Sequence, residues 1–282
     1  MENTIRLREV NVRGWRMGFA NLFHETNGSF WHTKKWLIQT VLWFVILNGC
    51  LMPIWSIPAD SMTEAIASLP NLTSLMAAAT NPLANLFVTY FLICTLGLPV
   101  AAIIAGQDAI IGERQSGTGA WILSKPVSRT AFILSKLAAS TIGLLVTGVV
   151  VQGVGVYAQL SAKAGSAWPV AEFAGAMGLV FLNLLFYLTL TFMLGAIFTS
   201  RGVVLGISLA AALAGPLMLY SVPIISDITP WGFFYSGLED MPPGLALALG
   251  NPPESVVPIL GTALMCIIFT VVTLLRFQRE EL

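Results

Sequence analysis

Charge is scarce in this sequence, and it is absent from the segments where ion transport would require it. Only 10% of the 282 residues are charged, and none of the 14 basic and 14 acidic residues lies inside the six long apolar runs. Proton relays and ion-coupled carriers usually keep an ionisable side chain at membrane depth. The sequence therefore disfavours a secondary carrier or channel, which stays open as an alternative. If the protein moves a substrate, the energy is expected to come from outside the chain.

The sequence also lacks the marks of several other classes of protein. Its three cysteines show no C-x-x-C spacing, so neither a disulfide nor a metal site is expected. A net charge of zero gives no basic field that would attract nucleic acid. His24 and His32 lie outside the apolar runs, and no paired carboxylates converge within them. An intramembrane enzyme is therefore the least expected function.

The apolar runs predict an all-α membrane protein with six transmembrane helices. Each run has at least 20 residues, enough for a helix rising about 1.5 Å per residue to cross a hydrocarbon core of about 30 Å. The expected membrane domain covers residues 36–275, with spans at residues 36–55, 85–106, 137–160, 173–199, 202–225 and 256–275.

Four amides are the polar side chains nearest the middle of these spans: Gln39, Asn48, Gln152 and Asn183. Amide side chains at membrane depth commonly form hydrogen bonds between helices. We therefore expect interhelical partners for them, with contacts to a ligand as the alternative. No residue is assigned to substrate binding, because a single sequence does not orient the helix faces.

The basic residues predict the orientation of the chain in the membrane. Thirteen of the fourteen lie before the first span, between spans two and three, in the hairpin after span four or in the tail 276–282, and only Lys163 lies on the other side. Loops rich in Lys and Arg stay in the cytoplasm. We expect a multi-pass protein of the cell (inner or plasma) membrane with both termini cytoplasmic.

Two segments outside the spans are also expected to be helical. Within the cytoplasmic N-terminus 1–35, the apolar residues of 10–24 share one helix face, which predicts an amphipathic interfacial helix. A loosely ordered basic leader is the alternative. The extracytoplasmic loop 226–255 has aromatic and apolar stretches bracketed by prolines. It predicts short interfacial helices packed on protein, with an ordinary loop as the alternative.

The cytoplasmic segment 107–136 combines helix breakers with charged and apolar residues. The second span is expected to continue as a helix past Asp108 and to break near Gly117, because glycine permits the backbone geometry that ends helices. Ser128 is a suitable N-cap for the helix that enters span three. We expect a compact protrusion that docks a partner, since an ordinary interhelical loop rarely needs thirty residues.

This segment carries a spaced motif: Glu113, Gly117-Thr118, Pro126, Ser128-Arg129 and Lys136. The set resembles the motif of the type-2 ATP-binding-cassette permeases, as found in bacterial or archaeal multidrug- or lipid-type exporters. The six spans, the N-terminal interfacial helix and an Asn-Pro pair in the last outer loop agree with that family. One departure is the small pair after Thr118, where relatives usually have bulky or acidic residues.

The resemblance implies a dimeric permease, homodimeric or heterodimeric, driven by two copies of a separate ATPase subunit. The chain has no G-x-x-x-x-G-K-[ST] run, so ATP and Mg would be bound by that subunit, and this chain needs no cofactor. The residues implied to couple the two subunits are Asp108, Glu113, Arg114, Gly117, Thr118, Pro126, Ser128 and Arg129. A cytoplasmic coupling helix would lie between transmembrane helices two and three, and Lys136 would be the anchor at the membrane boundary, next to lipid.

Export by an ATP-driven permease is the leading function that the sequence predicts. The first alternative is an ATPase-linked membrane module that assembles or matures an extracytoplasmic partner without transport. The second alternative is the secondary carrier or channel already disfavoured by the absence of charge within the spans.

Overall fold

The computed structural model describes most of the chain, and every regular element in the described part is a helix. The described residues are 14, 16–52, 82–117, 124–218, 223–234 and 241–279. The predicted all-α class is confirmed for these residues. Thr118 and its small successors, the first outer loop and most of the sequence before residue 16 lie outside them.

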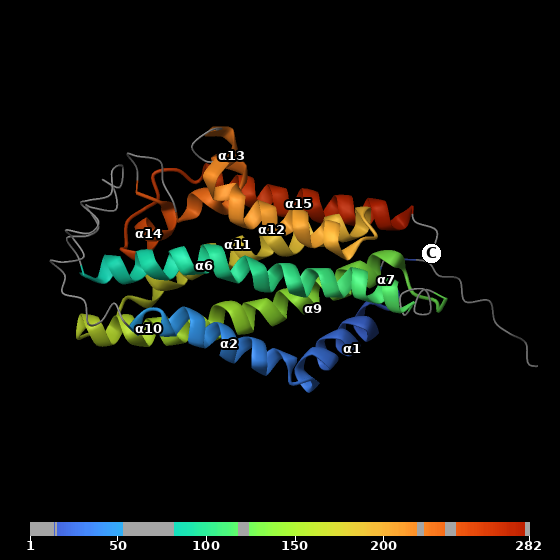
Figure 1. The fold of residues 1–282 in the computed structure, drawn as a ribbon, viewed down its shortest axis with the longest axis horizontal. Coiled ribbons are helices and arrows are strands. Elements are labelled where there is room, and N and C mark those ends of the chain that lie inside the picture. Colours follow the sequence, from blue (N-terminus) through green and yellow to red (C-terminus); the bar gives the residue numbers. More distant parts are fainter. Residues whose placement is uncertain are drawn as a thin grey trace, which may run out of the picture.

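Four helical rods run along the long axis of the molecule (Figure 1). They are long and apolar enough to cross a membrane: Thr89–Ser116, Arg129–Ala164, Val170–Ile197 and Val257–Gln278. The first consists of α6 (Pro82–Gln107) from Thr89 onward, a π-helix η1 (Asp108–Gly112) and α7 (Glu113–Ser116). The second consists of α9 (Arg129–Leu144), a π-helix η2 (Leu145–Val150) and α10 (Val151–Ala164). The others are α11 (Val170–Ile197) and α15 (Val257–Gln278). The chain is therefore a membrane protein.

The first and fifth predicted spans correspond to shorter helices. Where a span was expected at 36–55, helix α2 (Lys35–Gly49) has 15 residues, about 22 Å at 1.5 Å per residue. For the span expected at 202–225, the structure has α12 (Arg201–Met218) and then α13 (Pro223–Ile228). Length and composition thus identify four spanning helices in the described residues, with two shorter apolar helices beside them.

Helix α11 forms the centre of the bundle. It packs against α15 and α6 along much of its length, and also against α12 and α14 (Pro243–Ala248). Rings pair across these contacts: the centroids of Phe186 on α11 and Phe269 on α15 lie 5.4 Å apart, and those of Phe87 on α6 and Phe173 on α11 lie 6.5 Å apart. Because α11 touches so many helices, its position depends on all of them.

Short helices occur within residues 226–255, as predicted. They are the 3-10 helix η3 (Pro230–Phe233) and α14, and both begin with proline, which suits a first helical turn. Trp231 Nε1 donates to Tyr187 Oη on α11 (2.8 Å), and Trp168 Nε1 donates to the carbonyl of Ala248 (3.1 Å). Their packing on protein satisfies the condition for irregular backbone near a membrane.

The N-terminal helix begins later than the expected range 10–24. Helix α1 covers Phe19–His32 and packs along α9, and Gly18 precedes it with φ of +84°. A side chain at Gly18 would place its Cβ 2.9 Å from Val127 Cγ2. The backbone N–H of Ser128 also donates to the carbonyl of Met17 (3.1 Å). This tertiary contact places residues 16–18 outside the helix, and the predicted boundary was wrong.

The amides at membrane depth differ in their partners. Asn48 Nδ2 donates to Gln152 Oε1 (3.4 Å), and Gln159 Nε2 donates to Asn48 Oδ1 (3.0 Å), which joins α2 to α10 as predicted. Asn183 on α11 is fully buried, and neither atom of its amide has a hydrogen-bond partner among the described residues. Gln39 lies at the wall of a pocket. Only part of the predicted set therefore joins helices.

Replacing Asn183 with Leu is expected to stabilise the protein by about 1–3 kcal/mol, because a buried amide without partners costs about that much. Asn48→Leu is the matched control. It should destabilise the protein, since Gln152 Oε1 loses its donor and Gln159 Nε2 loses its side-chain acceptor. Unfolding in mixed micelles measures both variants. A loss of stability in Asn183→Leu would show that this amide binds water or a second subunit.

Candidate functional site

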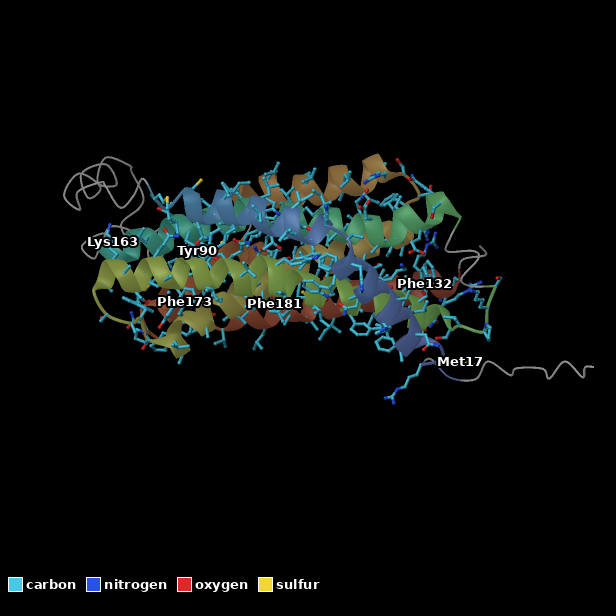
Figure 2. All side chains as sticks on the ribbon, turned by 90° about the horizontal axis from the view of Figure 1, so that it is seen from below. Met17, Tyr90, Phe132, Lys163, Phe173 and Phe181 are labelled. Atoms are coloured by element: carbon cyan, nitrogen blue, oxygen red, sulfur yellow. The ribbon has the colours of Figure 1, made fainter. Side chains whose placement is uncertain are left out.

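Most of the basic residues that the structure describes gather at one end of the bundle, which we call the charged end. It consists of η1 and α7, the start of α9, the turn between α11 and α12, and the end of α15, at the right of Figure 1. Figure 2 shows Lys163 at the opposite end from Met17 and Phe132. The segment 107–136 lies at the charged end, apart from residues 118–123, which lie outside the description.

The helix that leaves α6 ends where the sequence predicts a break. Gly117 has φ of +72°, and its N–H donates to the carbonyl of Arg114 (3.3 Å). Such a left-handed glycine is a common helix terminator, since it carries no Cβ. Immediately before α7, the π-helix η1 replaces ordinary helical pairing, a feature frequent at functional sites.

Glu113 and Lys136 form an ion pair inside the charged end. Lys136 Nζ lies 2.5 Å from Glu113 Oε1, and the two side chains are only 7% and 24% exposed. The ammonium of Lys136 also lies 5.1 Å from the centre of the Phe132 ring. The pair joins the end of the α6 rod to α9. Both side chains, predicted as a docking charge and as a lipid anchor, have a partner within the chain.

Arg114 binds the carboxyl end of α11. Its Nη1 donates to the carbonyls of Gly195 (2.6 Å) and Phe198 (3.4 Å). The last carbonyls of a helix have no partners within it and carry a partial negative charge, so a guanidinium there is favourable. Arg114 also lies 5.8 Å from the centre of the Phe277 ring on α15. One side chain thus contacts two other spanning helices.

Asp108 connects the same segment to α12. Its Oδ1 lies 3.0 Å from Arg201 Nη2 and accepts a 2.6 Å hydrogen bond from Gln107 Nε2. Both charged side chains are about half exposed, so this pair contributes little to stability. Sequence reasoning did not assign Arg201 to the site. The sequence offered one indication of this role: Arg201 is the only basic residue in a tight hairpin between two apolar runs.

The restart of the chain at α9 is fixed by two further contacts. Ser128 is the N-cap, as predicted, and its Oγ accepts from the N–H of Ala131 (3.0 Å). Arg129 Nη1 donates to the carbonyl of Gln278 (3.0 Å), and the Phe132 and Phe277 rings stack 5.6 Å apart. The start of α9 is therefore attached to the end of α15.

These contacts connect one segment to five helices. Asp108 reaches α12, Glu113 reaches α9, Arg114 reaches α11 and α15, and Ser128 reaches Met17 just before α1. The described part of the segment that faces outward is its tip, residues 115–117 and 124–126, which includes Gly117 and Pro126. The site can thus transmit a displacement of its tip to most of the bundle.

The described residues offer no group of three or more His, Cys, Asp or Glu side chains able to hold a metal ion. In a comparison with known families, residues 31–282 match the family described as ABC-2 family transporter protein. Comparison with curated proteins gave no match. The matched range contains every element of the charged end.

We expect Lys136→Met to destabilise the protein by roughly 3 kcal/mol, the lower end of the range for breaking a buried ion pair. The cost arises because the carboxylate of Glu113 keeps its charge without its partner. The double variant Glu113→Met/Lys136→Met should recover most of the loss, since it removes both charges. Unfolding of the two single variants and the double variant in mixed micelles measures the coupling. Additive losses would contradict the pairing.

Proposed function

The chain belongs to the ABC-2 transporter family, and from this premise we propose that it is the membrane subunit of an exporter driven by a separate ATPase. The family consists of membrane permeases of ABC transporters, which supports the partner ATPase inferred from the motif. Two ATPase copies and two permease copies complete the proposed assembly. ATP and Mg would be held by the ATPase, since this sequence has no phosphate-binding run.

The observation that supports this function best is the convergence of helices on segment 107–136. An ATPase that binds the exposed tip would move α7 and the start of α9 together, because Glu113 and Lys136 join them. The movement would reach α11 and α15 through Arg114 and α12 through Asp108. Glu113 and Arg114 then act by transmitting force within the permease, while the tip makes the contact with the ATPase.

The proposed topology has six spans, with the charged end in the cytoplasm. Helix α2 is short, but Ile38, Val41 and Val45 on it are more than half exposed, as expected of side chains that face lipid. The basic residues at the charged end favour a cytoplasmic location. With α2 and α12 counted as spans, both termini lie on the cytoplasmic side. Helix α1 would then lie along the inner leaflet.

Affinity purification of the tagged protein from native membranes should recover an ABC ATPase at near one-to-one stoichiometry. Inside-out vesicles containing both subunits should then take up the substrate only with ATP, which tests the export direction. Recovery of the chain alone in several mild detergents would overturn the proposed partner. Co-purification with ATPase activity but with an extracytoplasmic enzyme attached would favour the assembly or maturation role instead.

Glu113→Ala is expected to lower stimulation of the partner's ATP hydrolysis by at least about fivefold, the lower bound of typical coupling between sites. The reason is that α7 loses its contact with α9 while the tip stays intact. Lys163→Ala, at the opposite end of the bundle, is the matched control and should leave stimulation unchanged. Both variants must still co-purify with the ATPase. Normal stimulation by Glu113→Ala would remove the assignment of this pair to coupling.

A further inference from the structure

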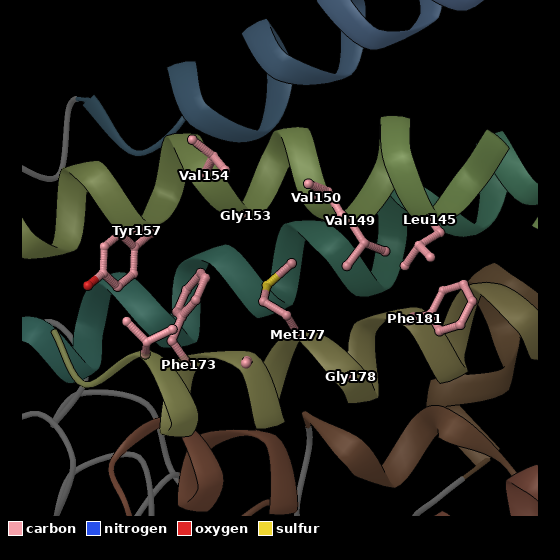
Figure 3. A pocket seen from close by; sticks show the side chains of 12 residues that line it. Leu145, Val149, Val150, Gly153, Val154, Tyr157, Phe173, Met177, Gly178 and Phe181 are labelled. Atoms are coloured by element: carbon pink, nitrogen blue, oxygen red, sulfur yellow. The ribbon is translucent and has the colours of Figure 1, made fainter. Parts of the chain in front are cut away.

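Two pockets of similar size lie on the bundle, and their walls differ in chemistry. The side pocket, of about 560 Å³, lies between η2–α10 and α11, and only apolar side chains such as Leu145, Met177 and Phe181 line its middle (Figure 3). The corner pocket, of about 590 Å³, lies where α1 and α2 meet, against α6, η1 and α9. Charged, hydroxyl and apolar side chains all line it.

The wall of the corner pocket changes from charged to apolar along the helix axes. Asp108 and Glu113 line it near the end of the α6 rod. Ala101 lines it about 10 Å deeper than Asp108, at 1.5 Å per residue. On α9, Lys136 is followed by Leu144 about 12 Å deeper. Such a gradient matches a molecule with a polar head and an apolar chain.

The apolar part of this wall is open to the surroundings. Ile38, Leu42 and Ile104 all line the pocket, and they are between 49% and 65% exposed. In a membrane these side chains would lie against hydrocarbon. An acyl or alkyl chain could therefore enter the pocket sideways from the bilayer without crossing a polar barrier.

The polar part of the wall favours a head group that donates hydrogen bonds. It contains two carboxylates, Asp108 and Glu113, and one amine, Lys136. Lys136 binds Glu113 Oε1, while Glu113 Oε2 is buried and has no hydrogen-bond partner among the residues that the structure describes. Among the ionisable side chains of the wall, carboxylates therefore outnumber amines, and Asp108 also contacts Arg201 outside the pocket.

We propose that the corner pocket binds one amphiphile whose head group is a protonated amine. The ammonium would lie near Asp108 and Glu113, where it gains charge-assisted hydrogen bonds, and the chain would lie along Leu42, Ile104 and Leu144. Two sources share this chemistry: an aminophospholipid of the surrounding leaflet, or a cationic amphiphile that the protein transports. The site belongs to the chain itself and does not depend on the proposed ATPase partner.

Native mass spectrometry of the full-length protein with phosphatidylethanolamine or phosphatidylglycerol of equal chain length tests the head-group preference. We expect one phosphatidylethanolamine to be retained roughly tenfold more strongly, as one charge-assisted hydrogen bond would give. Asp108→Asn should reduce this preference severalfold while the chain still binds. Equal retention of the two lipids by the unmodified protein would overturn the proposal.

A bulky substitution tests the location. Ala105→Trp fills the corner pocket and should abolish the retained lipid, whereas Ala174→Trp in the side pocket is the matched control and should retain it. Loss in the control alone would overturn the assignment. If Ala105→Trp fails to fold, Asp108→Asn still decides the question.

A competition experiment identifies the source of the amphiphile. Dodecylamine should displace phosphatidylethanolamine from the unmodified protein, and failure to displace it would count against a shared amine site. In vesicles with the ATPase, depletion of the bound amine on addition of ATP would identify transported cargo. Occupancy that ATP does not change would identify a resident lipid, and both of these results support the site.

Discussion

The carboxyl end of α11 is the point on which the arrangement of the charged end depends. A helix leaves its last four carbonyl groups without intrahelical partners, and near hydrocarbon water does not readily replace them. In this chain the guanidinium of Arg114 donates hydrogen bonds to three carbonyls around the end of α11. Because Arg114 lies on α7, the central helix and the motif segment are attached to each other. The neighbouring contacts of Asp108 and Glu113 follow from that placement.

The charged side chains of segment 107–136 join helices within the chain, although the sequence suggested that they would contact a partner subunit. Within the apolar runs, the helices are held together by apolar packing and a few hydroxyl and amide groups. The contacts that charged side chains make with residues distant in sequence are therefore concentrated at the charged end. Glu113, Arg114 and Asp108 each contact an element at least 23 residues away in sequence. The family match identifies the chain as a membrane permease of the ABC-2 type, and under the proposed function these contacts would transmit motion from the partner ATPase.

Features set by local chemistry could be predicted from the sequence, and features set by distant contacts could not. The helix break at Gly117 and the cap at Ser128 depend on the backbone freedom of glycine and on a hydroxyl next to a helix start, and both are confirmed. The start of α1 depends on Val127, more than a hundred residues away, and was placed wrongly. The partners of Glu113 and Arg114 could not be predicted either, because they are distant in sequence and are brought close only by the fold. Asn183 shows that a buried amide need not form the interhelical hydrogen bond expected of an amide within a span.

The contact between Gly18 and Val127 restricts which residues these two positions can accept during evolution. A residue with a side chain at position 18 would adopt an unfavourable left-handed backbone and would also meet the Val127 methyl groups. A larger residue at position 127 would press on the backbone at 18. Positions 18 and 127 are therefore expected to vary together among relatives. Substitutions just before α1 would then depend on those just before α9.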